Sequence, residues 1–475
     1  MVAGLVALLT GVLRAPPAAP DDARLTFRYA ARLATGHGYT FNDHEHVFGA
    51  SNGLYTFLLA ALRWAGVDLD HAAIAIGVVA LAVAVGAAAW LARSLAGPLA
   101  GWLTATLLLV IVSYWDNAIS GMEAGVSSAL GLLAVCCARR ERDVAAGVLV
   151  GLALFNKFDA VLLALALGGA SIWVRRRVPW RTAVAAGLTV APYLVFCATW
   201  FHTLIPQSAR AKLGGSADDP SYRHFDPFWM LSRIEYALPC APAAAVATWQ
   251  ARRRSASPDP GARVAVLTLA GWAVLHLAVF SSIDLGAPWP WYVTVTVPPI
   301  VVLGTLPAGP WLTRTAQRCW EARTRLLPVG VAEARRSLLV TAVTAGVLVS
   351  LGVNTIDSVK LQIEGEKPHL WEHRMEQAST WVRDHGRVTD VVDAQCWGTV
   401  PYELLTNPVV DPCRLNGLRP LGPAAWTFRW TAEPTDGRWP AVAGFCAVTS
   451  FGRPPENSLV VYHRAGGGPP CRPRA

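Results

Sequence analysis

Two adjacent carboxylates, Asp21 and Asp22, follow an apolar N-terminal segment and precede two arginines, Arg28 and Arg32. Such a pair has two chemical uses: one carboxylate accepts a proton from an attacking hydroxyl group, or both ligate a divalent cation such as Mg or Mn. No other cofactor follows from the sequence. The structural alternative is helix capping, because Pro-Asp-Asp-Ala before an apolar-periodic stretch is a typical N-cap pattern.

A second polar group is Pro206-Gln-Ser-Ala-Arg210-Ala-Lys212, which follows a long apolar stretch. Arginine and lysine at this spacing suit a phosphate group, since arginine gives bidentate hydrogen bonds and lysine a point charge. An ordinary interfacial basic pair that reaches lipid headgroups is the alternative. The sequence leaves both open.

Other polar and aromatic residues stand at the ends of apolar stretches. Glu123 opens one stretch, and Lys157 and Asp159 separate two short ones, where a local ion pair is the simplest account. Trp291 and Tyr292 end the run Pro-Trp-Pro-Trp-Tyr. This run is typical of an interfacial aromatic belt, with a platform for a sugar ring as the alternative.

The elements that position these residues are mainly membrane helices. The chain has 475 residues, of which 53% are hydrophobic and 15% charged, and its mean hydropathy is +0.36. Stretches long enough to cross the bilayer recur, roughly eleven in all, through Val353. The predicted fold is therefore an α-helical polytopic membrane protein. The clearest stretches are 72–92, 99–112, 182–201, 264–283 and 337–353, with 144–155 and 160–174 shorter.

The formal net charge of +9 does not indicate a nucleic-acid partner, because the arginines cluster in short loops between apolar stretches. The clusters lie at 139–142, 175–181, 252–254 and 314–336, on alternate loops. With these loops in the cytoplasm, the loop of Asp21 and everything after Asn354 lie outside. We therefore expect a multi-pass plasma-membrane protein with an extracytoplasmic C-terminal domain.

The predicted domains are a transmembrane part, 1–353, with a first extracytoplasmic loop at 15–71, and a soluble part, 354–475. We interpret 1–13 as a first helix rather than a signal peptide. In the soluble part the patterns predict a helix over 371–386, strands at 388–394 and 408–411, and a helical turn at 402–405. These elements indicate a small α/β or α+β domain.

Four cysteines of the soluble part would face an oxidising compartment, which makes one or two disulfides plausible there without fixing their pairing. They are Cys396, Cys413, Cys446 and Cys471.

The ordered motifs resemble the GT-C superfamily of polyprenyl-phosphate-sugar glycosyltransferases, and within it most resemble the actinobacterial terminal arabinofuranosyltransferases. The motifs that carry the resemblance are Asp21-Asp22-Ala-x-x-x-Phe-Arg-Tyr-Ala, Gly36-His-Gly-x-x-Phe-Asn42, Val47-x-Gly-x-Ser-Asn52, Ser120-Gly-Met-Glu123, Leu204-Ile-Pro-x-Ser-x-x-Ala-Lys212, Cys396-Trp-Gly-x-x-x-Tyr402, Val410-Asp411 and Leu415-Asn-Gly-Leu418. The resemblance therefore spans nearly the whole chain.

The resemblance implies transfer of a sugar, arabinofuranose, from a polyprenyl-phosphate donor to a cell-envelope polysaccharide. By position, it makes Asp21 or Asp22 the catalytic acid residue, and it places a donor-phosphate site and a substrate site. The donor-phosphate residues would be Arg28, Arg210 and Lys212, and the substrate-binding residues His37, Asn42, Glu123, Trp291 and Tyr292. Two departures concern the donor: Lys157-Phe-Asp159-Ala replaces an Arg-Pro-acid-Gly turn, and Trp291 replaces an arginine.

Three alternatives remain open. One is a mannosyltransferase that uses polyprenyl-phosphate mannose, and another is a transporter or flippase of lipid-linked sugars. A transporter should carry its charges midway through its helices, whereas the candidate residues lie at helix ends. The third alternative is a noncatalytic envelope-assembly protein, which would not need the acid pair.

Overall fold

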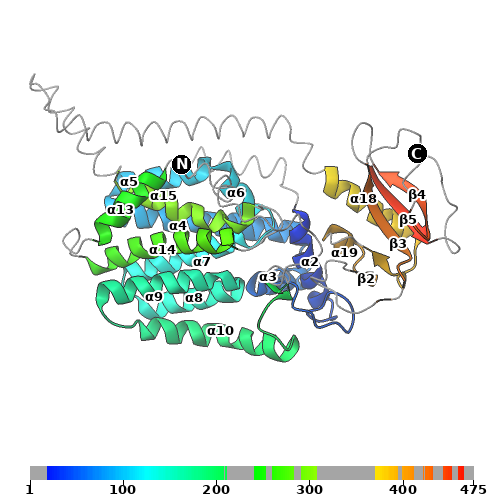
Figure 1. Ribbon diagram of the computed structural model, residues 1–475, viewed down its shortest axis with the longest axis horizontal. Coiled ribbons are helices and arrows are strands. Elements are labelled where there is room, and N and C mark those ends of the chain that lie inside the picture. Colours follow the sequence, from blue (N-terminus) through cyan, green and yellow to red (C-terminus); the bar gives the residue numbers. More distant parts are fainter. Residues whose placement is uncertain are drawn as a thin grey trace, which may run out of the picture. The chain divides into compact units, whose positions relative to one another are not determined.

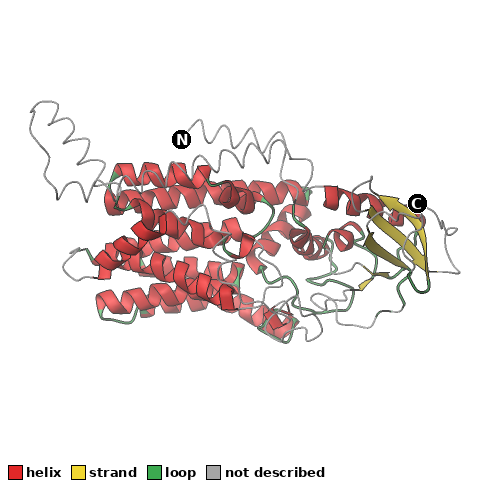
Figure 2. Ribbon diagram, turned by 45° about the horizontal axis from the view of Figure 1, so that its top comes forward, coloured by secondary structure: helices red, strands yellow, loops and turns green. Residues whose placement is uncertain are grey.

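The computed structural model describes residues 19–207, 209–210, 240–252, 259–282, 290–307, 370–393, 398–410, 421, 423–431, 442–451 and 458–464. These residues form two compact units (Figures 1 and 2). Unit 1 contains the described residues of 74–193 and 240–307. Unit 2 contains 19–73, 194–210 and the described residues from 370 onward.

Unit 1 is helical. Its helices are α4 (Leu69–Ala96), α5 (Pro98–Val110), α6 (Val112–Ile119), α7 (Ala124–Arg139), α8 (Asp143–Asn156), η1 (Phe158–Ala160), α9 (Val161–Arg175), α10 (Trp180–Trp200), α13 (Ala241–Arg252), α14 (Pro260–Ser282), η4 (Pro290–Tyr292), η5 (Thr294–Thr296) and α15 (Val297–Thr305). The first residues of α4 and the last turns of α10 belong to unit 2. Helix α14 packs against α9 and α7, and α7 against α8 (Figure 1).

Four described helices are long and apolar enough to cross a membrane: Leu69–Ala96, Phe158–Arg175, Trp180–Trp200 and Pro260–Ser282. They confirm long apolar helices at four of the predicted spans, 72–92, 160–174, 182–201 and 264–283. Shorter apolar helices cover 98–110 and 143–156. The predicted total of roughly eleven spans is not confirmed, and the segments 1–13 and 337–353 lie outside the described residues.

Helix α8 approaches α10 through two glycines one helical turn apart. A Cβ atom on Gly147 would lie 2.4 Å from the carbonyl oxygen of Thr182, and one on Gly151 would lie 2.5 Å from the Cβ of Thr189. Small residues four apart let membrane helices pack with their backbones close together, which gains dispersion energy where no hydrophobic driving force exists. The two glycines therefore set the distance between α8 and α10.

Unit 2 combines the segment after residue 19 with the C-terminal segment. Its elements are α2 (Asp21–Ala34), α3 (Gly53–Trp64), α18 (Leu370–His385), β1 (Val392–Asp393), α19 (Thr399–Glu403), β2 (Val409–Val410), β3 (Trp426–Thr431), β4 (Phe445–Phe451) and β5 (Ser458–Arg464). The sheet has the order β2-β1-β3-β5-β4. Strand β1 is parallel to both neighbours, whereas β3, β5 and β4 are antiparallel.

The buried run of β5 explains why the sheet is covered by a helix. Residues Leu459 to Tyr462 are all buried, and α18 packs on β5 and β4. Helix α18 buries Met375, Ala378 and Val382, whose spacing puts them on one face. The predicted helix at 371–386, the helical turn and a strand in each predicted segment are confirmed, and the parallel and antiparallel pairings make the sheet mixed.

We expect Gly151→Ala to lower the melting temperature of the detergent-purified protein, because the added methyl group overlaps α10. Gly168→Ala is the matched control, since a Cβ atom there meets no atom within 4 Å. Alanine also favours a helix over glycine by about 1 kcal/mol, so the control should be neutral or stabilising. Equal melting temperatures for the two variants would contradict the close packing of α8 on α10.

Candidate functional site

Helix α2 buries three arginines at intervals of four residues: Arg24, Arg28 and Arg32 are 5%, 0% and 3% exposed. Residues four apart lie on one face of a helix, so the three guanidinium groups form a single row. Apolar residues Phe27, Ala30 and Ala31 are buried beside them. A row of buried cations needs acceptors, and in unit 2 the C-terminal segment supplies most of them.

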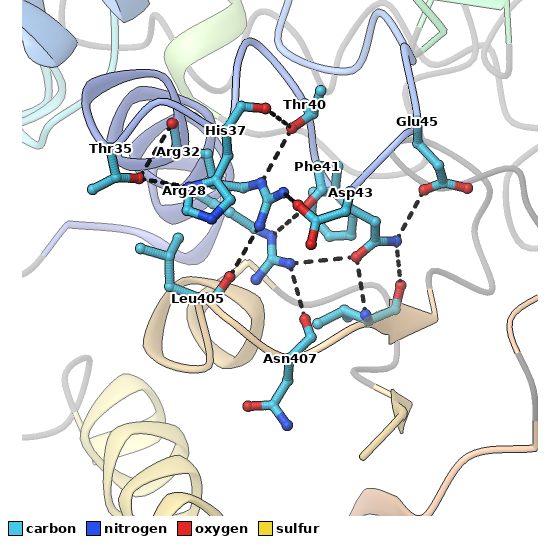
Figure 3. A network of polar contacts seen from close by, with 12 residues as sticks. Arg28, Arg32, Thr35, His37, Thr40, Phe41, Asp43, Glu45, Leu405 and Asn407 are labelled. Atoms are coloured by element: carbon cyan, nitrogen blue, oxygen red, sulfur yellow. Dashed lines mark hydrogen bonds and ion pairs between the residues drawn. The ribbon is translucent and has the colours of Figure 1, made fainter. Parts of the chain in front are cut away.

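Arg28 is the middle arginine of this row, and Figure 3 shows it beside Arg32, Phe41 and Asn407. Its Nε donates to the carbonyl oxygen of Phe41 at 2.8 Å, and its Nη1 to those of Pro401 and of Leu404, the latter at 3.2 Å. Its Nη2 donates to Asn42 Oδ1 at 3.3 Å and to the carbonyl of Asn407 at 3.2 Å. Burial, together with the charge of Arg32, lowers the pKa of Arg28 to about 9, which leaves it protonated at neutral pH.

The flanking arginines extend the same contacts. Arg24 pairs with Asp70 at 3.2 Å and with Glu376 of α18 at 2.9 Å. Arg32 donates to the carbonyl of Leu405 at 3.2 Å and pairs with Asp43. Each of the three arginines thus contacts the C-terminal segment: Arg24 contacts α18, and Arg28 and Arg32 contact residues at the end of α19. The row therefore joins α2 to α18 and α19.

Asp21 contacts the other end of α19. Its carboxylate accepts hydrogen bonds from the amides of Gly398 and Thr399 at 2.7 and 2.8 Å, and from the Thr399 hydroxyl at 2.8 Å. Burial raises the pKa of Asp21 although these bonds oppose the rise. Gly398 is required by the close approach, since a Cβ atom there would lie 2.0 Å from the Asp21 carbonyl oxygen. Asp21 thus satisfies amides that the first turn of α19 leaves without partners.

The structural alternative, that Asp21 or Asp22 caps α2, is wrong. The N-cap position is Pro20, with no capping side-chain hydrogen bond, and Asp21 and Asp22 stand in the first turn. Asp21 instead caps α19, and Asp22 is exposed to solvent. The two neighbouring carboxylates therefore have different surroundings: that of Asp21 is bonded to α19, and that of Asp22 is exposed.

Of the two other substrate-binding residues predicted in unit 2, Asn42 is buried and His37 is exposed. Asn42 is buried and exchanges hydrogen bonds with the backbone of Val409, accepting at 3.0 Å and donating at 2.9 Å. His37 is exposed, and its Nδ1 lies 3.0 Å from the Thr35 hydroxyl (Figure 3). Asn42 therefore acts here as a backbone partner for strand β2.

Arg210 belongs to unit 2 because the chain after α10 packs on the first loop. Trp200 stacks on His46 with ring centroids 4.2 Å apart, and the amide of Gln207 donates to the Phe48 carbonyl at 2.8 Å. Arg210 is exposed and donates to the Thr203 hydroxyl at 3.1 Å. Lys212 lies outside the described residues.

In unit 1 the structure brings Glu123 and Tyr292 together around a lysine. Lys157 Nζ is 2.5 Å from Glu123 Oε1 and 4.0 Å from Asp159 Oδ2. The same nitrogen lies 5.7 Å from the centre of the Tyr292 ring, and Trp291 is adjacent to Tyr292, 6.3 Å between ring centroids. The simple Lys157 to Asp159 pair is thus replaced by a cluster in which Glu123 is the nearer acid.

Sequence reasoning missed several members of these groups. Arg24 and Arg32 were assigned to no site, although their four-residue spacing from Arg28 is a signal of a shared helix face. His276, which donates through Nε2 to the Tyr292 carbonyl at 2.7 Å, was signalled only as a histidine within an apolar stretch. Thr399 gave no signal at all.

Metal and disulfide predictions have separate outcomes. Among the described residues, no group of three or more His, Cys, Asp or Glu side chains is arranged to hold a metal ion. Asp21 is already occupied by three donors, so it fits a Mg or Mn site poorly. Cys446 is disulfide-bonded, while Cys396, Cys413 and Cys471 lie outside the described residues.

The fold has counterparts among solved structures. ArnT from Cupriavidus metallidurans in the apo state has a TM-score of 0.60 at 15% identity, covering 97% of each chain. The same protein bound to undecaprenyl phosphate has a TM-score of 0.56 at 15% identity, covering 94% of each chain. No protein-family model and no curated protein matches the sequence. The chain therefore shares the fold of ArnT over nearly its whole length.

We expect Asp21→Asn to destabilise unit 2 by about 1–3 kcal/mol. The NH2 group of asparagine is a donor, so it would face a backbone N–H whose hydrogen bond the Asp21 carboxylate accepts in the wild type. The control is Asp384→Asn, which changes an exposed carboxylate of α18 in the same unit. Thermal unfolding of the purified proteins measures the difference. If both variants unfold together with the wild type, Asp21 does not hold α19.

We expect Arg28→Lys to destabilise the protein by roughly 2–4 kcal/mol, because one ammonium group cannot reach the carbonyls that five guanidinium donors satisfy. Arg63→Lys, at an exposed position in the last turn of α3, keeps the same chemical change without burial. Limited proteolysis should release C-terminal fragments sooner from Arg28→Lys alone. Identical digestion rates would show that the hydrogen bonds of Arg28 contribute little.

Proposed function

We propose that this membrane protein is a glycosyltransferase that takes a sugar from a polyprenyl-phosphate donor. The observation that carries the proposal is the fold shared over 97% of both chains with ArnT, which also has a structure with bound undecaprenyl phosphate. The motifs that resemble GT-C glycosyltransferases point in the same direction. The acid pair at the start of α2 supports it, since a transferase of this kind needs a base for the acceptor hydroxyl.

In the proposed reaction, Asp22 is the catalytic residue. Its carboxylate accepts the proton of an acceptor hydroxyl while that oxygen bonds to the anomeric carbon of the sugar. The bond between the anomeric carbon and the phosphate oxygen breaks, and polyprenyl phosphate leaves with the bonding electrons. Asp21 is a positioning residue, because its three hydrogen bonds to Gly398 and Thr399 fix the first turn of α2.

The charge that develops on the leaving phosphate requires cations. Arg28 is excluded from our proposal because its donors are already occupied by buried acceptors. Arg210 is exposed and, among the described residues, forms no ion pair. We therefore assign the phosphate to Arg210 together with Lys212, which follows it by two residues.

The finer features of the proposal come from the resemblance of the motifs. They favour arabinofuranose as the sugar, a cell-envelope polysaccharide as the acceptor, and the outer face of the plasma membrane as the place of transfer. A transfer assay with each donor distinguishes polyprenyl-phosphate mannose from polyprenyl-phosphate arabinofuranose. The exposed His37 is retained as a substrate-binding residue, and Trp291 and Tyr292 as candidates for contact with the sugar ring.

We expect the purified wild type to transfer labelled sugar from polyprenyl-phosphate arabinofuranose to a short arabinan, and Asp22→Asn to reduce the rate by about 10²–10⁴-fold. The Asp384→Asn variant removes an equally exposed carboxylate of unit 2 and should keep full activity. Transfer from polyprenyl-phosphate mannose instead would replace the sugar but keep the reaction. Absence of transfer from both donors, or full activity of Asp22→Asn, would contradict the proposal.

A further inference from the structure

Glu123, Lys157 and Asp159 form a charged cluster in unit 1 that the proposed phosphate chemistry does not use. The side chains of Glu123, Lys157 and Asp159 are 5%, 17% and 18% exposed, so Glu123 is buried and the other two are largely withdrawn from solvent. They come from the start of α7 and from the short connection between α8 and α9. Ions withdrawn from water in a membrane helical unit are costly and therefore usually functional.

Unpartnered polar atoms adjoin this cluster. The carbonyl of Tyr292 can only accept a hydrogen bond, so His276 Nε2 carries the proton and His276 Nδ1 is left as the second polar atom of the ring. This Nδ1 is buried without a hydrogen-bond partner among the described residues, as is Oδ1 of Asn156. Asn156 is fully buried and donates to Ser127 Oγ at 2.8 Å and to the carbonyl of Glu123 at 3.4 Å. Buried polar atoms without partners are costly and commonly mark a place where a ligand or water completes the bonding.

The charge of the cluster decides which ligand it suits. Among the described residues, one ammonium group, that of Lys157, faces two carboxylates, those of Glu123 and Asp159. A phosphate group placed beside these carboxylates is repelled by them, and the repulsion is weakly screened where the charges are withdrawn from water. The short distance between Lys157 and Glu123 also leaves the ammonium already neutralised. The cluster therefore suits neutral hydroxyl groups better than phosphate.

Sugars present hydroxyl groups that donate and accept, together with an apolar ring face. Carboxylates accept from hydroxyls, an ammonium group donates to them, and an aromatic ring covers the apolar face. Glu123, Lys157 and Asp159 supply the polar part, and Tyr292 lies within 5.7 Å of the lysine nitrogen. Phe280 stacks on both His276 and Tyr292, with ring centroids 4.4 and 5.6 Å apart, which holds the two rings in place.

We propose that Glu123, Lys157 and Asp159, with Tyr292 beside them, form a subsite that binds the hydroxyl groups of the donor sugar and makes no contribution to phosphate binding. This inference rests on the proposed function, since it names the part of the donor that this site recognises. It assigns recognition of sugar and of phosphate to different residues. Loss of the cluster should therefore weaken the binding of lipids that carry a sugar and leave the binding of the bare lipid phosphate unchanged.

The test compares binding of two lipids, undecaprenyl phosphate and polyprenyl-phosphate arabinofuranose, to the detergent-purified full chain. Asp159→Asn is the first variant, because its 4.0 Å contact with Lys157 is the weaker of the two and its loss should leave the fold intact. Glu123→Gln is the second variant. Each should weaken binding of the sugar-bearing lipid by about tenfold or more and leave binding of undecaprenyl phosphate unchanged.

The chain offers a matched control in Asp143→Asn. Asp143 pairs with Arg175 at 2.8 Å, so this change breaks the other ion pair between the segments of α8 and α9, at their opposite ends. It should alter the affinity for neither lipid. A melting temperature is recorded for every variant, so that loss of folding is distinguished from loss of binding.

Two results would overturn the inference while leaving the proposed function intact. Equal weakening of both lipids by folded Asp159→Asn would make the cluster part of the phosphate site, and unchanged affinities in both variants would remove it from the donor site. If the wild type binds neither this donor, nor its mannose counterpart, nor undecaprenyl phosphate, the proposed function itself fails, and the inference with it. The two failures are therefore separate observations.

Discussion

Burial of three arginines on one face of α2 is the constraint on which unit 2 depends. A guanidinium group removed from water costs several kcal/mol unless its donors are satisfied. For Arg28, at 0% exposure, satisfaction comes from the carbonyls of Pro401, Leu404 and Asn407 and from the first loop. Helix α2 therefore cannot reach this state until a segment some 370 residues further along the chain is in place.

The same helix contacts both ends of α19, which has only five residues. A helix this short is not stable alone, because nearly all its amides and carbonyls lack partners within it. Asp21 supplies an acceptor at the N-terminal amides, and Arg28 and Arg32 supply donors to the last carbonyls. These charges also complement the dipole of the helix. In consequence, Asp21, which looks catalytic in the sequence, is committed to structure, and our proposal assigns the catalytic role to its exposed neighbour Asp22.

Separating the two carboxylates changes how the acid pair is understood. The motif places two acids together, but the proposed reaction needs a base that is exposed to a hydroxyl group and held in a fixed direction. Asp21, by holding the first turn of α2 against Gly398 and Thr399, provides the second requirement for Asp22. In unit 1, the ion pair of Lys157 with Glu123 is the reason why we propose sugar recognition there, whereas our proposal assigns phosphate to the exposed Arg210.

The elements with strong local signals were predictable from the sequence. Apolar stretches gave the spans around α4, α9, α10 and α14, and helical spacing gave α18 within one residue at each end. Strands β3, β4 and β5 were not predicted, although 459–462 is a continuous apolar run, because short apolar runs do not distinguish a buried strand from a helix. The partners of Arg28 and Asp21 could not be predicted, since backbone carbonyls and amides have no sequence signature and lie far along the chain.

The most direct test of this account is amide hydrogen exchange over 398–407 in the wild type and in Arg28→Lys, with β5 as the internal reference. If α2 holds α19, exchange over 398–407 is slow in the wild type and much faster in Arg28→Lys, while Leu459 to Tyr462 exchange equally slowly in both. Unchanged exchange over 398–407 in Arg28→Lys would contradict the claim that the arginine row builds unit 2.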